Sequence, residues 1–232
     1  MFSIFNRTPT ITLDCFTPIP DLPELFPLKK ASGIVPNWWK NLKPTVEYKG
    51  INRGSLKMCP GVTDYFKTGF IITCWRDFII EVNSGIPNVL PENTADLHNP
   101  IQWGDEALQG YAHVKLVSPW RIKEKTGCKF LFTNTFWHNN THQYFIPNGI
   151  VNYKYQHATN VNLVVNKNAF PKRFELNAGE PIVHCLPISD KNIKIKMHVV
   201  SDEEFAKTDN YHFTFSGNYY KSKKFKKENK ND

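Results

Sequence analysis

The sequence lacks several patterns that would assign a covalent framework or an export route. Its five cysteines are odd in number, lie far apart and form no C-x-x-C pair, which disfavours a disulfide scaffold and a zinc knuckle. The chain opens with no basic region followed by an apolar segment, and no run approaches the roughly 18 apolar residues of a membrane span. We therefore expect a soluble protein that is not secreted and has no membrane partner.

The chain also lacks the common catalytic signatures. No Gly-rich phosphate loop follows a strand pattern, and none of the eight histidines is followed two positions later by Asp or Glu. Cys185 directly follows His184, but neighbouring side chains of a strand point to opposite faces, so the thiol and the imidazole cannot activate each other. The residues therefore predict no catalytic group and no cofactor.

Strand patterns dominate what is present. Residues 128–188 are a series of short apolar or alternating runs separated by Asn, Gly and Pro, and further strands are predicted at residues 10–16, 70–82, 111–117 and 192–199. In the last of these we expect alternate residues to face inward: Ile193, Ile195, Met197 and Val199. Arg76 interrupts the apolar run of 70–82 and predicts a bend or bulge there. Residues 83–105 have the composition of a loop.

Some eight or nine strands predict a mainly β fold, namely an antiparallel β-sandwich or jelly roll of the double-stranded β-helix kind. Two or three short helices are expected, at residues 36–42, 60–68 and 201–207. The helix at 201–207 begins with a capping box formed by Ser201 and Glu204. We predict one domain over residues 1–217, with its core in 55–217.

An arm rich in proline precedes that core, within residues 10–48. Proline at 18, 20, 23, 27, 36 and 44 forbids a long helix or a central strand. The arm carries many apolar residues, so we expect it to wrap over one face of the sheet. Its adjacent Trp38 and Trp39 are predicted to pack there, and the alternative is a platform for a ligand or a protein partner.

Half of the net charge of +8 lies in the last residues of the chain. We expect residues 218–232 to form a solvated, disordered tail, with attraction to nucleic acid or to an acidic surface as the alternative. The lysines concerned are Lys221, Lys223, Lys224, Lys226 and Lys227.

Three histidines offer a candidate metal site. His138 and His142 flank a polar loop, and His184 lies on a later predicted strand that could pair with the rim of that loop. Three imidazoles would suit zinc, iron or manganese. The alternative is that His138 and His142 are surface residues and that His184 is a hydrogen-bonded core histidine.

Four segments together carry a family resemblance: FPLKKASGIVPNWWKNL, LKMCPGVTDYFKTGFIITCWRDFII, IPNGIVNYKYQ and FELNAGEPIVHCLPI. Their combination, spanning residues 23–189, resembles a family of uncharacterised proteins of tailed phages of marine bacteria and cyanobacteria. The resemblance implies a viral origin, with location in the host cytoplasm or the virion, and supports the β-sandwich. It implies no activity and no catalytic residues.

Three functions follow as hypotheses. The first is a non-enzymatic, phage-type β-sandwich that acts in particle structure or binds a protein partner, including further copies of itself. The second is a cupin-like metal enzyme, such as an iron and 2-oxoglutarate oxygenase, with the three histidines as ligands. The third is nucleic-acid binding through the Lys-rich tail and its aromatic residues.

Overall fold

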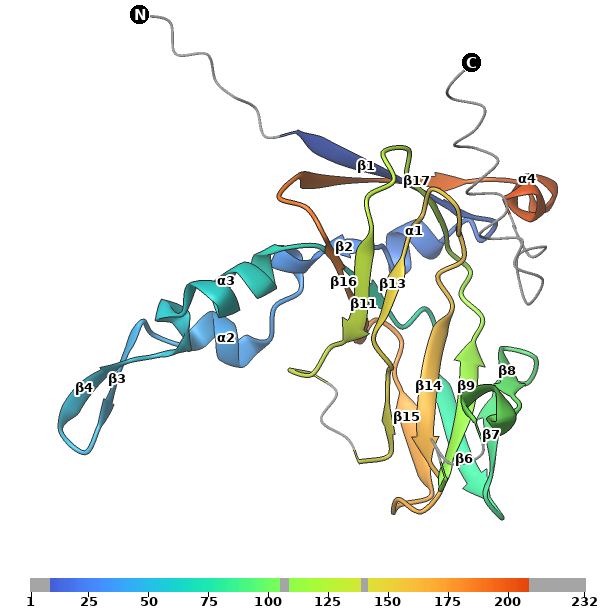
Figure 1. The fold of residues 1–232 in the computed structure, drawn as a ribbon, viewed down its shortest axis with the longest axis horizontal. Coiled ribbons are helices and arrows are strands. Elements are labelled where there is room, and N and C mark those ends of the chain that lie inside the picture. The colour runs from blue at the N-terminus through green and yellow to red at the C-terminus, as the bar shows by residue number, and fades with distance from the viewer. Residues whose placement is uncertain (1–8, 105–108, 139–141, 209–232) are drawn as a thin grey trace, which may run out of the picture.

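The computed structural model describes residues 9–104, 109–138 and 142–208, and within them the chain is mainly β (Figure 1). The registered strand pairs are antiparallel, except that β1 (Thr10–Thr17) runs parallel to β17 (Asn192–Val199). The strands form several open sheets, and they are more numerous than the eight or nine expected. The described sheets do not close into a barrel. The predicted Lys-rich tail lies outside the described residues.

A three-stranded sheet joins the two ends of the described chain. Its central strand, β1, lies between β17 and the antiparallel β10 (Arg121–Lys123). The strict alternation of TITLDCFT buries Ile11, Leu13 and Cys15 completely. The alternation of β17 is less effective than predicted, because Ile193 is buried and Ile195 half-buried whereas Met197 and Val199 are exposed.

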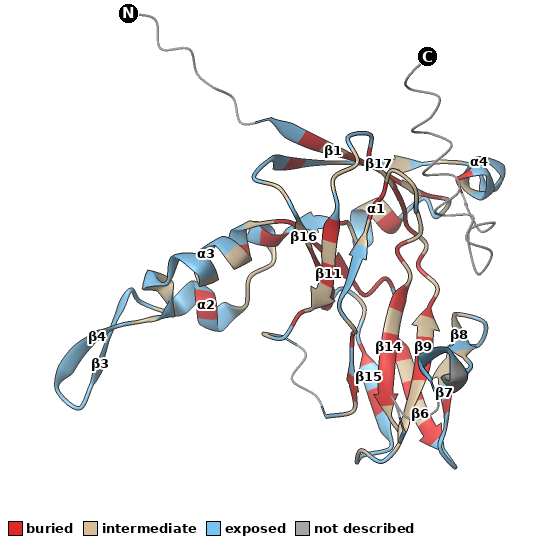
Figure 2. Ribbon diagram, viewed as in Figure 1, coloured by how far each residue is buried: buried red, intermediate tan, exposed pale blue. Residues whose placement is uncertain are grey.

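The remaining large sheets enclose the main hydrophobic core (Figure 2). The five-stranded sheet has the order β13 (Gly149–Val151), β11 (Phe130–Asn134), β16 (Pro181–Pro187), β5 (Phe70–Thr73), β2 (Lys29–Lys30). The four-stranded sheet has the order β12 (Tyr144–Phe145), β14 (Val161–Asn166), β9 (Tyr111–Leu116), β8 (Ala95–His98). The three-stranded sheet has the order β15 (Arg173–Leu176), β6 (Phe78–Asn83), β7 (Ile86–Leu90).

The long strand predicted at residues 70–82 is two strands that belong to different sheets. β5 pairs with β16, whereas β6 pairs with β15, so the chain changes sheet at residues 74–77, where the bend was predicted. The strands that pair with them, β15 and β16, are likewise consecutive in the chain, which passes between the same two sheets at residues 177–180. The prediction that 83–105 is a loop is wrong, because the segment forms β7, β8 and the 3-10 turn η3 (Pro100–Trp103). β7 follows β6 directly in the chain, and each residue of β7 pairs with a residue of β6.

The helices are short. The three predicted ones are confirmed as α2 (Asn37–Asn41), α3 (Pro60–Lys67) and α4 (Asp202–Lys207), the last with the predicted capping box. A further helix, α1 (Leu22–Leu25), lies in the proline-rich segment. Two more 3-10 turns are η1 (Ala31–Gly33) and η2 (Leu56–Met58).

The proline-rich segment covers the sheets only in its first part. Leu22, Leu28 and Ala31 are buried, and β2 adds to the edge of β5. Residues 34–68 then project from the body with α2, the hairpin of β3 (Thr45–Tyr48) and β4 (Ile51–Gly54), and α3 (Figure 1). We call residues 34–68 the projecting arm. The expectation that the whole segment wraps over a sheet is therefore wrong, because the hairpin supplies its own strand pairing away from the body.

Candidate functional site

His184 anchors the root of the projecting arm. It lies on β16, and its Nε2–H donates a hydrogen bond to the carbonyl oxygen of Thr68, at 2.7 Å. Its ring meets the ring of Tyr65 edge-on, with the centroids 4.6 Å apart. Burial lowers the pKa of His184, while the bond to Thr68 opposes that shift. His184 is therefore the hydrogen-bonded core histidine of the alternative prediction.

The other two histidines of the predicted metal site lie on the surface. His138 follows β11 in a turn, with its Nε2 3.9 Å from Oε2 of Glu180, and His142 is exposed. Within the described ranges, no group of three or more His, Cys, Asp or Glu side chains is placed to hold a metal ion. The structure therefore does not bring His138, His142 and His184 together, because β16 turns the imidazole of His184 toward α3.

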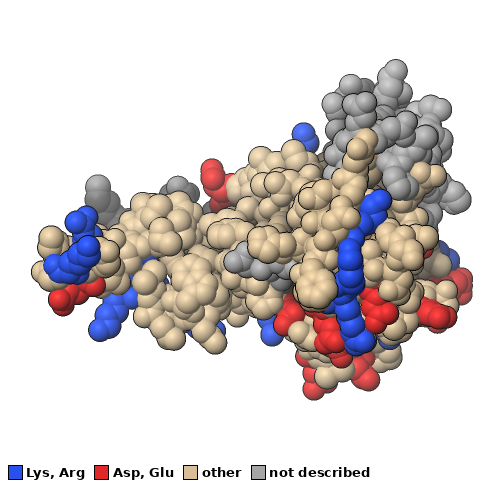
Figure 3. All heavy atoms as spheres, turned by 90° about the horizontal axis from the view of Figure 1, so that it is seen from below, with Lys and Arg blue, Asp and Glu red and all other residues tan. Residues whose placement is uncertain are grey.

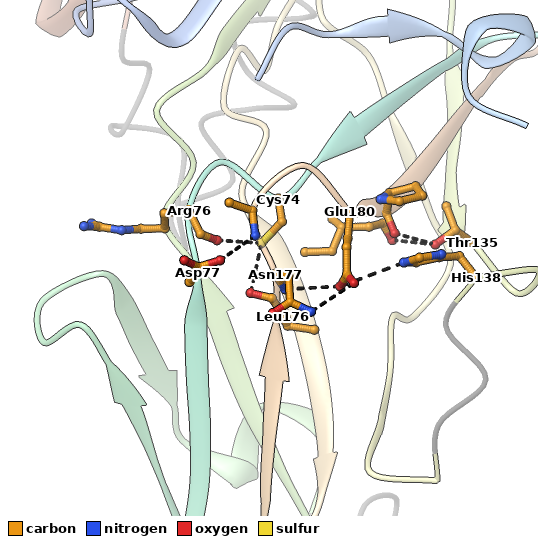
Figure 4. A network of polar contacts seen from close by, with 11 residues as sticks. Cys74, Arg76, Asp77, Thr135, His138, Leu176, Asn177 and Glu180 are labelled. Carbon is orange, nitrogen blue, oxygen red and sulfur yellow. Dashed lines mark hydrogen bonds and ion pairs between the residues drawn. The ribbon is translucent and has the colours of Figure 1, made fainter. Parts of the chain in front are cut away.

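Hydrogen bonds join residues 74–77 to residues 177–180, at the place where each of these two segments passes from one sheet to another (Figure 4). Cys74 N–H donates to the carbonyl of Glu180 at 2.7 Å, and Gly179 N–H donates to the carbonyl of Cys74 at 2.7 Å. The carboxylate of Asp77 accepts from Ala178 N–H at 2.8 Å. These hydrogen bonds hold residues 74–77 against the turn at residues 177–180. We call these two segments together the joint.

The carboxylate of Glu180 serves the same joint. It accepts from the backbone N–H of Asn177 at 3.1 Å and from the side-chain amide of Asn177 at 3.0 Å. Gly179, in the turn at residues 177–180, adopts a φ of 83°. The strands on its two sides nevertheless belong to different sheets, so the turn is part of the joint.

The buried thiols have the wrong protonation state for nucleophiles. Burial raises the pKa of Cys74 to about 12, and its Sγ–H donates to the carbonyl of Arg76. Burial also raises the pKa of Cys15 and Cys185 well above the usual range. Cys185 faces Tyr153 in the core, on the opposite side of β16 from His184, as predicted for neighbours on a strand.

Aromatic side chains attach the arm to the body. Trp39 is buried and lies 4.6 Å from the ring of Phe66, and Phe66 in turn meets Trp137 of the body at 5.9 Å. Trp38 contacts both Trp39 and Phe66 edge-on, yet 45% of its surface stays exposed. Trp39 is thus packed, but against α3 of the arm and not over a face of the sheet as predicted, whereas Trp38 forms a half-open aromatic surface near the root of the arm.

The hairpin of the arm has one apolar face, and it is uncovered. Cross-strand pairing places Val46 opposite Arg53 and Tyr48 opposite Ile51, so these four side chains share one face. Val46, Tyr48 and Ile51 are 39%, 61% and 55% exposed. The alternation that produces this face is visible in the sequence, but residues 45–48 were predicted as the end of the wrapping arm, and no strand was predicted at residues 49–54.

The arm is also basic. Residues 40–58 contain five basic side chains and one acidic one, Glu47. Figure 3 shows Lys and Arg at the tip of the arm together with acidic atoms, and on the body it shows Asp and Glu on both sides of a basic stretch. Lys57 lies over the ring of Trp39 at 5.7 Å and donates to the carbonyl of Lys40, so the charge continues to the root.

Comparisons with protein-family models, curated proteins and solved structures returned no match. Among the described residues, no helix has both the length and the hydrophobicity to cross a membrane. The function must therefore be argued from the geometry, and the projecting arm is the candidate functional site.

Proposed function

We propose that this chain is a non-enzymatic, phage-type β-sandwich or jelly-roll protein that acts in particle structure or partner binding, in the host cytoplasm or the virion. Its binding element is the projecting arm. One observation carries the proposal: the hairpin extends away from the body with its apolar face in solvent.

A two-stranded hairpin on its own is marginally stable in water. The β3–β4 hairpin pairs over four registered positions and gains a further bond at its base, where Ser55 N–H donates to the carbonyl of Pro44 at 2.8 Å. A protein surface laid on Val46, Tyr48 and Ile51 would bury apolar area that is now in contact with water. The hairpin therefore gains stability from a partner.

The chemistry of this face favours a protein over a nucleic acid. Aliphatic Val46 and Ile51 are two of the four side chains on this face. Aliphatic side chains contribute little to recognition of phosphates or bases. Apolar centres with a charged rim are the usual composition of protein interfaces. Trp38, 45% exposed, adds a separate aromatic surface near the root of the arm.

A photo-cross-linking amino acid placed at position 48 tests the proposal in cells that make the particle or host assembly. We expect position 48 to cross-link to protein, and a control at Lys194, exposed on β17, to give much less. The double variant Tyr48→Ser, Ile51→Ser should reduce incorporation into the assembly by at least about tenfold, as loss of two apolar anchors costs more than about 1.4 kcal/mol. Equal cross-linking at positions 48 and 194, with unchanged incorporation, would overturn the proposal.

A further inference from the structure

We propose that the partner of the arm is a second copy of this chain, and that the apolar hairpin face of one copy docks on the outer face of the β15–β6–β7 sheet of the next. This inference rests on the proposed function and names the partner. It is argued from two faces of the same molecule that have matching apolar residues and opposite charge.

The β15–β6–β7 sheet has an outward face as well as a core face. Phe78, Ile80 and Val82 of β6 are buried, so the alternate residues Ile79 and Glu81 face outward. Cross-strand pairing adds further residues to this outer face: Leu90 opposite Ile79, Ile86 opposite Asn83, Asn88 opposite Glu81, and Arg173 and Glu175 on β15. Ile86 is 65% exposed. The outer face therefore combines three apolar side chains with carboxylates.

The charges of the two faces are complementary. Glu81 and Glu175 both form ion pairs with Arg173, at 3.2 and 3.3 Å, which leaves one net negative charge among the three. The hairpin presents Arg53 on its apolar face and Lys49 at its turn. Docking would place two basic side chains beside two carboxylates, a pairing that steers association and sets register.

The two faces lie on different parts of the molecule: the hairpin is at the far end of the projecting arm, whereas the β15–β6–β7 sheet belongs to the body (Figure 1). A contact between them is head-to-tail, so each copy that joins leaves one arm and one sheet face free. Such a contact closes into a ring or extends into a filament, according to the rotation between copies.

The contact is small. Four residues of strand span roughly 13 Å, so the hairpin face buries less than the about 1,200 Å² that marks a stable interface. We therefore expect an affinity in the micromolar range or weaker for a single contact. Association should be measured by sedimentation velocity over a wide range of protein concentrations.

The test uses two charge reversals in the full chain, Arg53→Glu and Glu175→Lys. Each variant alone opposes like charges across the contact, so each should weaken self-association by at least about tenfold. An equimolar mixture should recover association, because the unaltered arm of one variant meets the unaltered sheet face of the other. The double variant Arg53→Glu, Glu175→Lys should recover it as well.

Lys194→Glu is the matched control, since it reverses an exposed charge on β17 outside both faces and should leave association unchanged. Recovery in the mixture supports the head-to-tail contact. A monomer at every concentration, or loss that neither the mixture nor the double variant restores, overturns it. Loss of association on nuclease treatment also overturns it and assigns the basic arm to nucleic acid. If the second-copy contact fails while position 48 still cross-links to another protein, the proposed function stands and only the identity of the partner changes.

Discussion

At the scale of single residues, buried histidines decide how the protein responds to acid. His184 is 1% exposed and His113 is 8% exposed. His113 accepts a hydrogen bond from Trp103 Nε1–H at 2.9 Å through Nδ1, so its proton resides on Nε2, where it donates to Asn162. Burial lowers the pKa of both imidazoles, and the nearby His98 and Lys115 lower that of His113 further. Both rings are therefore neutral in the folded protein at neutral pH.

The predicted consequence is a loss of stability on acidification. In the unfolded chain histidine titrates near pH 6.5, whereas in the folded chain these two titrate lower. Between those values the unfolded state binds more protons, so the free energy of unfolding falls as pH drops below about 6.5, by at most about 1.4 kcal/mol per pH unit for each histidine. Below the folded pKa values this contribution is constant.

Urea unfolding of His184→Gln from pH 7 to pH 5 measures the effect. Glutamine can still donate to the carbonyl of Thr68 but does not titrate, so the pH dependence should become shallower than in the wild type. An unchanged slope in His184→Gln would show that its protonation is not linked to unfolding.

At the scale of elements, α4 shows how a short helix is held at the end of a sheet. Ser201 Oγ accepts from Glu204 N–H at 3.2 Å, and the Glu204 carboxylate accepts from Ser201 N–H at 3.2 Å. The ring of Phe205 lies 4.8 Å from the guanidinium of Arg121, and His157 donates to the carbonyl of Thr208. The capping box and these tertiary contacts thus stabilise α4 together.

Ser201→Ala should expose α4 without unfolding the body. Loss of the cap costs about 1 kcal/mol, which corresponds to about fivefold faster hydrogen exchange of the α4 amides. Glu203→Gln, which removes only an exposed ion pair with Lys207, should change exchange by less than half as much. Equal effects of the two variants would mean that the capping box does not limit opening of the helix.

At the scale of the whole molecule, stability depends on strand pairing between the two ends of the described chain. β1 and β17 pair in parallel over eight registered positions, from Thr10 with Asn192 to Thr17 with Val199. We expect two strands that are so far apart in the sequence to pair late in folding, because the chain must first lose the entropy of a long loop. β1 therefore links β10, β17 and the core.

Leu13→Ala tests this link. The side chain is fully buried in β1, so truncation should lower the free energy of unfolding by about 2–5 kcal/mol and speed exchange of the amides of β17 and β10 together. Leu25→Ala is the control, since Leu25 is 64% exposed and its loss should cost less than about 0.5 kcal/mol. A similar cost for both leucines would show that β1 contributes little to the core.

The sequence predicted those features that depend on interactions within a few residues. Alternation located β1 and β9, proline at the first turn located α3, and Ser201 with Glu204 located the start of α4. It failed at residues 83–105, where β7 and β8 form because neighbouring strands accept their hydrogen bonds. For the three histidines the sequence left a metal site and a surface-and-core arrangement open, since their convergence depends on which face of β16 turns toward the arm.

Gly69 separates what the sequence by itself determined from what only the tertiary structure decided. Composition and periodicity determined a mainly β chain and three of its helices, among them α3, just before Gly69, because these follow from hydrogen bonding and burial within a few residues. A Cβ at Gly69 would lie 2.2 Å from the carbonyl oxygen of Cys185, so this glycine is also required by a strand more than a hundred residues away. The change of sheet at residues 74–77 was likewise decided by long-range pairing, since β5 pairs with β16 and β6 pairs with β15, and no local pattern encodes those partners.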